Sequence, residues 1–182
     1  MRPLVYALAL LPALAHCQED SPESKWSFRI GPSFGQPILG SEDTRRGTVY
    51  SIAYTKPEPR FTLRGLKADM MVEGYYLFTK GGGFEDIPVN NMRSYGVLVT
   101  AKYPTRWFRG LKSHADLSFG LVYNSITTRD LDSNWNTTPG FGAGVSWGRY
   151  DFTVRWYHAS NGGTDGNNQG TNQFQYVLSV KF

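Results

Sequence analysis

The segment that decides the fold is the end of the chain, Asn172-Gln173-Phe174-Gln175-Tyr176-Val177-Leu178-Ser179-Val180-Lys181-Phe182. Large apolar side chains stand at every second position from Phe174 to Phe182, and polar side chains stand between them, with Val177 as the exception. Because successive side chains of a β-strand point to opposite sides, this pattern predicts a strand with one apolar and one polar face.

Seven further segments alternate in the same way, some less regularly: residues 26–33, 48–55, 66–79, 93–103, 114–124, 138–148 and 150–158. Long polar connections follow every other segment: residues 36–47, 80–92, 125–137 and 161–171. Outer-membrane barrels combine alternating strands with long extracellular loops and short periplasmic turns. The sequence therefore predicts an all-β protein, an eight-stranded antiparallel transmembrane β-barrel of the bacterial outer membrane. The connections 56–65 and 104–113 are longer than periplasmic turns usually are.

In this barrel the apolar faces meet lipid and the polar faces point inward. A soluble lipocalin-like barrel needs the reverse. Eight strands enclose too little room for an aqueous channel, so we expect the inward charges to pair across a packed interior. The inward charged residues are Arg29, Asp69, Glu73, Lys102, Asp116 and Arg155.

The first 15 residues resemble a secretory signal peptide. Arg2 precedes an apolar run that is too short to span a bilayer as a helix, and Ala13-Leu14-Ala15 fits a cleavage site. We therefore expect residues 1–15 to be removed and residues 16–182 to form one barrel domain. Cys17 is the single cysteine, which excludes a disulfide framework, and the bulky His16 before it argues against a lipoprotein.

Net charge and histidine placement exclude several other classes of function. The formal charge of +4 comes without a Lys/Arg cluster on one element, which argues against nucleic-acid binding and fits attraction to a phosphate-rich lipid surface. His16, His114 and His158 share no ligand spacing, so we expect neither a metal nor a cofactor.

One pair of polar residues stands at the rim of an apolar wall. His158 and Ser160 have the same parity as Phe152 and Trp156, and lie about 6–7 Å apart along a strand. Histidine can take the serine proton and so create a nucleophile for ester attack, and a third group usually orients the imidazole. Asn172 begins the neighbouring strand with matching parity. The alternative interpretation is a polar rim where the strand leaves the membrane.

The segment His158-x-Ser160-Asn161-Gly162, followed by Asn168-x-Gly170-x-Asn172, resembles the motif of the lipid A 3-O-deacylase (PagL-type) family. The resemblance covers the last two strands closely and the rest loosely. It implies an outer-membrane barrel whose active site faces lipid at the outer-leaflet, extracellular side. Ser160 would attack the ester at position 3 of lipid A, His158 would be the general base, and a 3-hydroxy fatty acid would leave. The resemblance implies three groups that hold the oxyanion: Asn161, the Gly163 amide and Asn168.

The expected partners are lipid A as the substrate, the surrounding outer-membrane lipids, and the insertion machinery, which reads a terminal Phe such as Phe182. The oligomeric state stays open, with a homodimer among the options.

At the position aligned with Asn172, known members of the family carry a glutamate. An asparagine can accept the imidazole N–H but cannot stabilise an imidazolium by charge, so we expect a glutamate here to keep or raise the rate. The departure leaves three options: a slower enzyme, recruitment of Asp165 from the loop, or a barrel without activity. The rival function is a non-catalytic small barrel with a structural, adhesion or surface-protection role.

Overall fold

The computed structural model describes residues 26–81, 91–107, 111–164, 166 and 169–182. The expected signal peptide, His16 and Cys17 lie outside these residues. Among the described residues, no helix is long and apolar enough to cross a membrane. The strands in chain order are β1 (Trp26–Gly35), β2 (Arg46–Leu63), β3 (Leu66–Lys80), β4 (Met92–Thr105), β5 (Lys112–Asn124), β6 (Trp135–Thr137), β7 (Gly140–Trp147), β8 (Tyr150–Ala159) and β9 (Thr171–Lys181).

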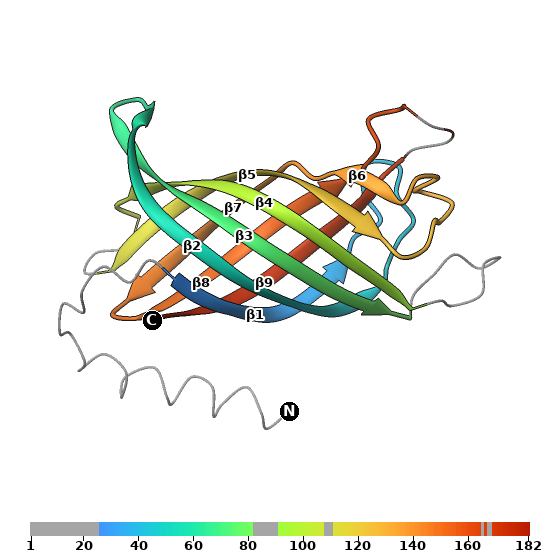
Figure 1. The fold of residues 1–182 in the computed structure, drawn as a ribbon, viewed down its shortest axis with the longest axis horizontal. Helices are drawn as coiled ribbons and strands as arrows, with labels where there is room; N and C mark the ends of the chain where they lie inside the picture. Colours follow the sequence, from blue (N-terminus) through green and yellow to red (C-terminus); the bar gives the residue numbers. More distant parts are fainter. Residues whose placement is uncertain (1–25, 82–90, 108–110, 165, 167–168) are drawn as a thin grey trace, which may run out of the picture.

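These strands close into an antiparallel barrel with eight wall positions (Figure 1). Each long strand pairs with its neighbour in the chain, and β1 pairs with β9 to complete the circle. The short β6 pairs with Leu121–Tyr123 of β5, and β7 pairs with the preceding part of β5, so the two share one wall position. The predicted eight-stranded barrel is confirmed, although the segment expected at 138–148 begins two residues later, after the separate β6.

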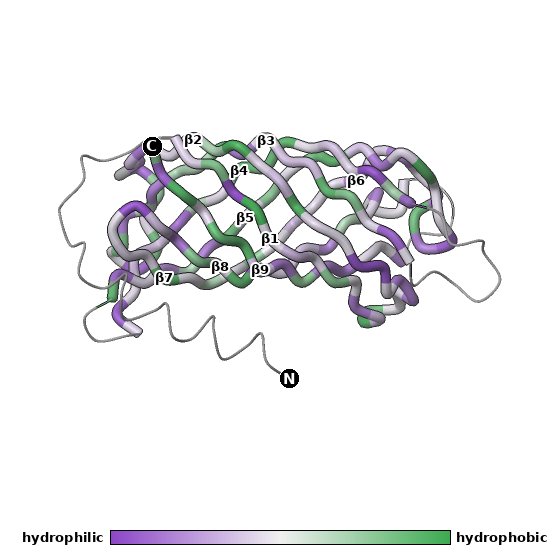
Figure 2. The backbone as a smooth tube through the Cα atoms, turned by 90° about the horizontal axis from the view of Figure 1, so that it is seen from below, coloured by the Kyte–Doolittle hydropathy of each residue, from purple (hydrophilic) through white to green (hydrophobic). Residues whose placement is uncertain are grey.

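The alternation seen in the sequence separates a lipid-facing surface from an enclosed interior. Along β5, Leu117, Phe119 and Leu121 are exposed, and the residues between them are more enclosed. On β1 and β4, exposed apolar residues likewise alternate with more enclosed ones. Figure 2 shows hydrophobic segments along several strands of the barrel wall. This exposed apolar surface is the expected lipid-facing belt.

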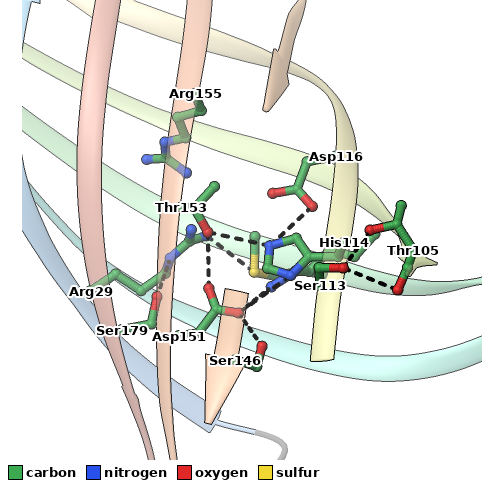
Figure 3. A network of polar contacts seen from close by, with 12 residues as sticks. Arg29, Thr105, Ser113, His114, Asp116, Ser146, Asp151, Thr153, Arg155 and Ser179 are labelled. Carbon is green, nitrogen blue, oxygen red and sulfur yellow. Dashed lines mark hydrogen bonds and ion pairs between the residues drawn. The ribbon is translucent and has the colours of Figure 1, made fainter. Parts of the chain in front are cut away.

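The interior is filled by paired charges. Glu73 Oε2 accepts hydrogen bonds from Arg29 Nη1 at 2.6 Å and from Arg155 Nη1 at 2.7 Å, and Glu73 Oε1 accepts one from Arg155 Nη2 at 2.8 Å. A second cluster joins His114 to Asp116 and Asp151 (Figure 3). Lys102 Nζ also lies 3.2 Å from Asp151 Oδ2. One expectation was wrong, since Asp69 is exposed. It lies only three residues after the start of β3, near the open end of the barrel.

The expected connection at 56–65 was also wrong. β2 continues to Leu63, β3 begins at Leu66, and a two-residue turn joins them. Arg64 and Gly65 have φ values of 48° and 81°, and positive values at both central residues are what a tight type I′ hairpin requires. The sequence predicted a connection here because prolines stand at positions 57 and 59, and proline normally argues against a strand interior. Here Pro57 is paired with Asp69 where the hairpin leaves the barrel.

Candidate active site

The candidate residues lie where β8 ends and β9 begins. His158 and Asn172 are direct partners across these strands. The loops of residues 36–45 and 125–134 and the described residues 160–164 and 169–170 lie at this same end of the barrel (Figure 1). The alternation of β8 buries Arg155 and Tyr157 inside and leaves Phe152 exposed, so His158 stands on the lipid-facing side. Histidine and asparagine are therefore brought together as the parity of their strands predicts.

The His158 imidazole is held on three sides. Its Nδ1 lies 3.0 Å from Asn172 Oδ1, and the Trp156 ring stacks near it with a centroid separation of 6.1 Å and an interplanar angle of 18°. Gly170 closes the third side, since a Cβ there would lie 2.4 Å from His158 Cε1. Gly170 also has a φ of +74°, which favours glycine. The imidazole is thus confined by packing as well as by its hydrogen bond.

The orientation of the Asn172 amide follows from a second contact. Its Nδ2 donates to the Ile38 carbonyl at 2.6 Å, and the Asn172 carbonyl accepts from Gln36 N at 2.9 Å. The loop of residues 36–45 therefore covers Asn172, whose exposed fraction is 0%. With Nδ2 committed to Ile38, Oδ1 faces the imidazole. An amide oxygen only accepts, so His158 Nδ1 carries the proton and the lone pair stands on Nε2.

Ser160 follows His158 at the edge of the wall. Its N–H donates to Thr137 O at 3.0 Å, and its carbonyl accepts from Thr137 N at 2.8 Å and from Thr137 Oγ1 at 3.0 Å. This bridge to β6 fixes the backbone of a half-buried serine. In the described part of the chain, no hydrogen bond joins its hydroxyl to His158. Such bonds are often long in unliganded enzymes and shorten with substrate.

The residues expected to hold an oxyanion form a turn just after Ser160. Asn161 is buried, and its Oδ1 accepts the Gly163 N–H at 2.8 Å. The Asn161 carbonyl accepts the Thr164 hydroxyl at 2.8 Å. The Gly163 amide is therefore bonded to Asn161 in this structure. The other two residues singled out in the sequence, Asn168 and Asp165, lie outside the described residues.

Asp130 is a supporting residue that the sequence did not reveal. It is fully buried, and its Oδ2 accepts hydrogen bonds from Ser41 Oγ and Glu42 N, each at 2.8 Å. Its carbonyl accepts the Gly170 N–H at 2.9 Å. One residue thus joins the loop that covers Asn172 to the glycine against His158. These contacts link segments 40 to 90 residues apart, and no local sequence pattern marks them.

An open apolar groove lies on the lipid-facing side of β1 and β9, lined by Pro32, Phe34, Gln36, Phe174 and Tyr176. The Phe34 and Tyr176 rings meet edge to face at 5.9 Å. Phe174 is two residues from Asn172 on the same side of β9 and pairs with Trp156 of β8. The polar residues therefore stand directly beside an apolar surface. No group of three or more His, Cys, Asp or Glu side chains in the described ranges could hold a metal ion.

Comparison with known proteins places this barrel in a family. The profile of the family described as Lipid A 3-O-deacylase (PagL) matches residues 23–181. The crystal structure of the outer membrane enzyme PagL is similar with a TM-score of 0.64 and 15% sequence identity, over 86% of this chain and 99% of that one. The Yersinia pestis outer membrane protein Ail, in a phospholipid bilayer nanodisc, gives a TM-score of 0.43 and 16% identity, over 88% of this chain and 100% of that one. No curated protein matches. Because the family profile spans every strand of the barrel, the chain belongs to the lipid A 3-O-deacylase (PagL) family of outer-membrane proteins.

Proposed function

We propose that this protein is a serine esterase that hydrolyses the 3-O-linked acyl chain of lipid A in the outer membrane. The observation that carries the proposal is the ordered contact from the Ile38 carbonyl through the Asn172 amide to His158 Nδ1, beside Ser160 on a lipid-facing wall. This contact leaves the Nε2 lone pair free to act as a general base. Family membership supplies the substrate class.

In the proposed first step, Ser160 Oγ attacks the ester carbonyl while His158 Nε2 takes its proton. The bond between the carbonyl carbon and the 3-oxygen of the sugar breaks to leave an acyl-serine, and His158 returns the proton to that oxygen, which becomes the 3-hydroxyl of lipid A. Water then attacks the acyl-serine with His158 again as the base. The bond between the acyl carbon and Ser160 Oγ breaks, His158 gives the proton back to Oγ, and a 3-hydroxy fatty acid leaves. Both tetrahedral intermediates carry an oxyanion, for which Asn161, the Gly163 amide and Asn168 are the proposed donors. The Gly163 amide would have to exchange its bond with Asn161 Oδ1 for one with the oxyanion.

The proposed site faces the outer leaflet from the extracellular side. The support is the concentration of the longer connections at the end of the barrel that holds His158, while the β2–β3 and β7–β8 connections at the other end are two-residue turns. The groove beside Phe174 offers an apolar surface for an acyl chain while the sugar stays at the rim. Two partners are also proposed: the insertion machinery, which would recognise Phe182, and a second copy of the chain in a homodimer.

The test compares Ser160→Ala and His158→Ala with the wild type. Each substitution should lower the rate of fatty acid release from purified lipopolysaccharide by ~10³-fold or more, since neither nucleophile nor base has a substitute. The control is Ser125→Ala, which removes a loop hydroxyl that accepts Arg93 N at 3.0 Å and is not part of the proposed catalytic machinery. Mass spectrometry of lipid A gives the position cleaved, and heat-modifiable migration on gels reports folding.

Full activity of Ser160→Ala would reject the serine-esterase mechanism. The observation in favour of the rival function is Asn172, which stands where known members of the family carry an acid. If the folded wild type leaves lipid A intact, the protein is a non-catalytic barrel with a structural, adhesion or surface-protection role.

A further inference from the structure

The β2–β3 hairpin extends beyond the barrel at the end opposite His158. Figure 1 shows it turning away from the barrel wall at the end where the C-terminus lies. Residues 60–67 form its outermost part, here called the hairpin tip. Thr62 pairs with Lys67, Leu63 pairs with Leu66, and Arg64-Gly65 makes the turn. The tip is therefore an ordered two-stranded ribbon.

The two sides of the hairpin tip differ in polarity. Leu63 and Leu66 are direct partners, so their side chains lie on the same side of the ribbon, and Phe61 precedes Leu63 by two positions. These three side chains have exposed fractions of 52% for Phe61, 49% for Leu63 and 43% for Leu66. Thr62 and Lys67 occupy the other side. A two-stranded ribbon has no core of its own in which to bury the apolar side.

The apolar side of the tip has the same strand parity as the lipid-facing surface, and a buried pair, Glu58 and Ala68, lies between the two. The irregularity in this hairpin lies on β2, between Glu58 and Thr62, so the side chains of β3 alternate regularly from Leu66 onward. Leu66 therefore lies on the same side of β3 as Val72, which is exposed to lipid. Lys67 has the parity of Glu73, which is enclosed in the barrel. Because the hairpin turns outward from the wall, its lipid-facing side turns toward the membrane surface.

The charge of the hairpin matches an anionic surface. Residues 56–67 contain four basic residues and one acid, Glu58, which Arg60 binds through hydrogen bonds of 2.7 and 3.0 Å. The β4–β5 connection at the same end repeats the combination, with Trp107 and Leu111 exposed beside Arg106 and Lys112. Exposed apolar side chains flanked by Lys and Arg are typical of segments that lie in a lipid–water interface.

We propose that the hairpin tip is an interfacial anchor that binds the phospholipid leaflet on the periplasmic side of the outer membrane. Phe61, Leu63 and Leu66 enter the acyl boundary, the basic side chains around them meet anionic headgroups, and Thr62 and Lys67 face water. The anchor holds the barrel at a defined depth, with the rim at His158 in the opposite leaflet. Lipid contact by the tip requires only the barrel, so it does not depend on deacylase activity.

The test uses the full chain in a Cys17→Ser background, which removes its single cysteine. An environment-sensitive fluorophore is attached to Leu63→Cys, on the apolar side of the tip. The matched control carries it on Lys67→Cys, which belongs to the next residue pair and lies on the opposite side of the ribbon. The proteins are reconstituted into phosphatidylethanolamine vesicles with and without phosphatidylglycerol. With phosphatidylglycerol, quenching by aqueous iodide should be several-fold weaker at position 63 than at position 67. Leu66→Cys repeats the measurement on the paired residue, and heat-modifiable migration confirms folding of each variant.

Equal iodide quenching at positions 63 and 67 would overturn the proposal, because the tip would then stand in water. The electrostatic part has its own test, in which Arg60→Gln and Arg64→Gln are added to the Leu63→Cys protein. Protection at position 63 should increase with phosphatidylglycerol in the parent and lose this dependence in the charge variant. The same protection in both proteins and both lipid mixtures would overturn the role of anionic headgroups.

Discussion

Asn172→Asp tests how the His158 imidazole is oriented. The two side chains have nearly the same shape, but the carboxylate has no N–H for the Ile38 carbonyl, which lies 2.6 Å from Asn172 Nδ2. The sequence alone favoured an acid here because a charge can stabilise the imidazolium. The structure changes this expectation, since the position is fully buried and one of its two polar atoms must be a donor.

The magnitudes decide between the two effects. Attraction between a carboxylate and an imidazolium at ~4 Å contributes about 4 kcal/mol at an effective dielectric constant of 20. Against it stand about 1–3 kcal/mol for leaving the Ile38 carbonyl without a partner and several kcal/mol for burying an anion that has no charge partner while His158 is neutral. Both penalties are present before the reaction starts, so they change the rate only through geometry: the carboxylate is driven away from the Ile38 carbonyl and no longer holds His158 Nδ1 in line. Because a misplaced catalytic group can cost more than the charge gain, we expect a deacylation rate about tenfold lower near neutral pH.

The assay is the initial rate of fatty acid release from lipopolysaccharide in detergent between pH 6 and 9 for wild type, Asn172→Asp and Asn172→Ala. A protonated aspartic acid can donate its O–H to Ile38 as the amide does, so the aspartate variant should recover relative to wild type as the pH falls. A rate at or above that of wild type throughout would refute the donor argument. If Asn172→Ala is as fast as wild type, Asn172 is not the orienting residue and Asp165 is the next to substitute.

Three further predictions follow from packing and charge. Gly170→Ala should lower deacylation by about tenfold or more with folding retained, because the new Cβ meets the His158 ring and φ is positive; an unchanged rate would show that the ring can move freely. Glu73→Ala should destabilise the barrel by about 3–5 kcal/mol by leaving Arg29 and Arg155 unpaired in the interior, and unfolding in urea followed by gel migration measures this loss. The folded wild type should fractionate with the outer membrane and migrate faster before heating, whereas recovery from the soluble periplasm would contradict the architecture.

The sequence was sufficient for the barrel and for the side of the wall on which the site lies. Alternation with a period of two is a local property, so the run from Phe174 to Phe182 and its seven counterparts could be read without knowing their partners. Parity along single strands likewise placed His158 and Asn172 on the lipid-facing side, and pairing between neighbouring strands brought them together.

Tertiary structure decided what surrounds these residues. The extension of β2 past two prolines was missed because strand pairing outweighed the local preference of proline. The Ile38 carbonyl lies 134 residues from Asn172 in the chain, and Asp130 joins three loops through contacts that no repeating pattern marks. A single asparagine beside a histidine can present either its oxygen or its nitrogen. Only the loop folded over it determines that the oxygen faces His158, because hydrogen-bond donors must be matched to the acceptors that the fold brings near.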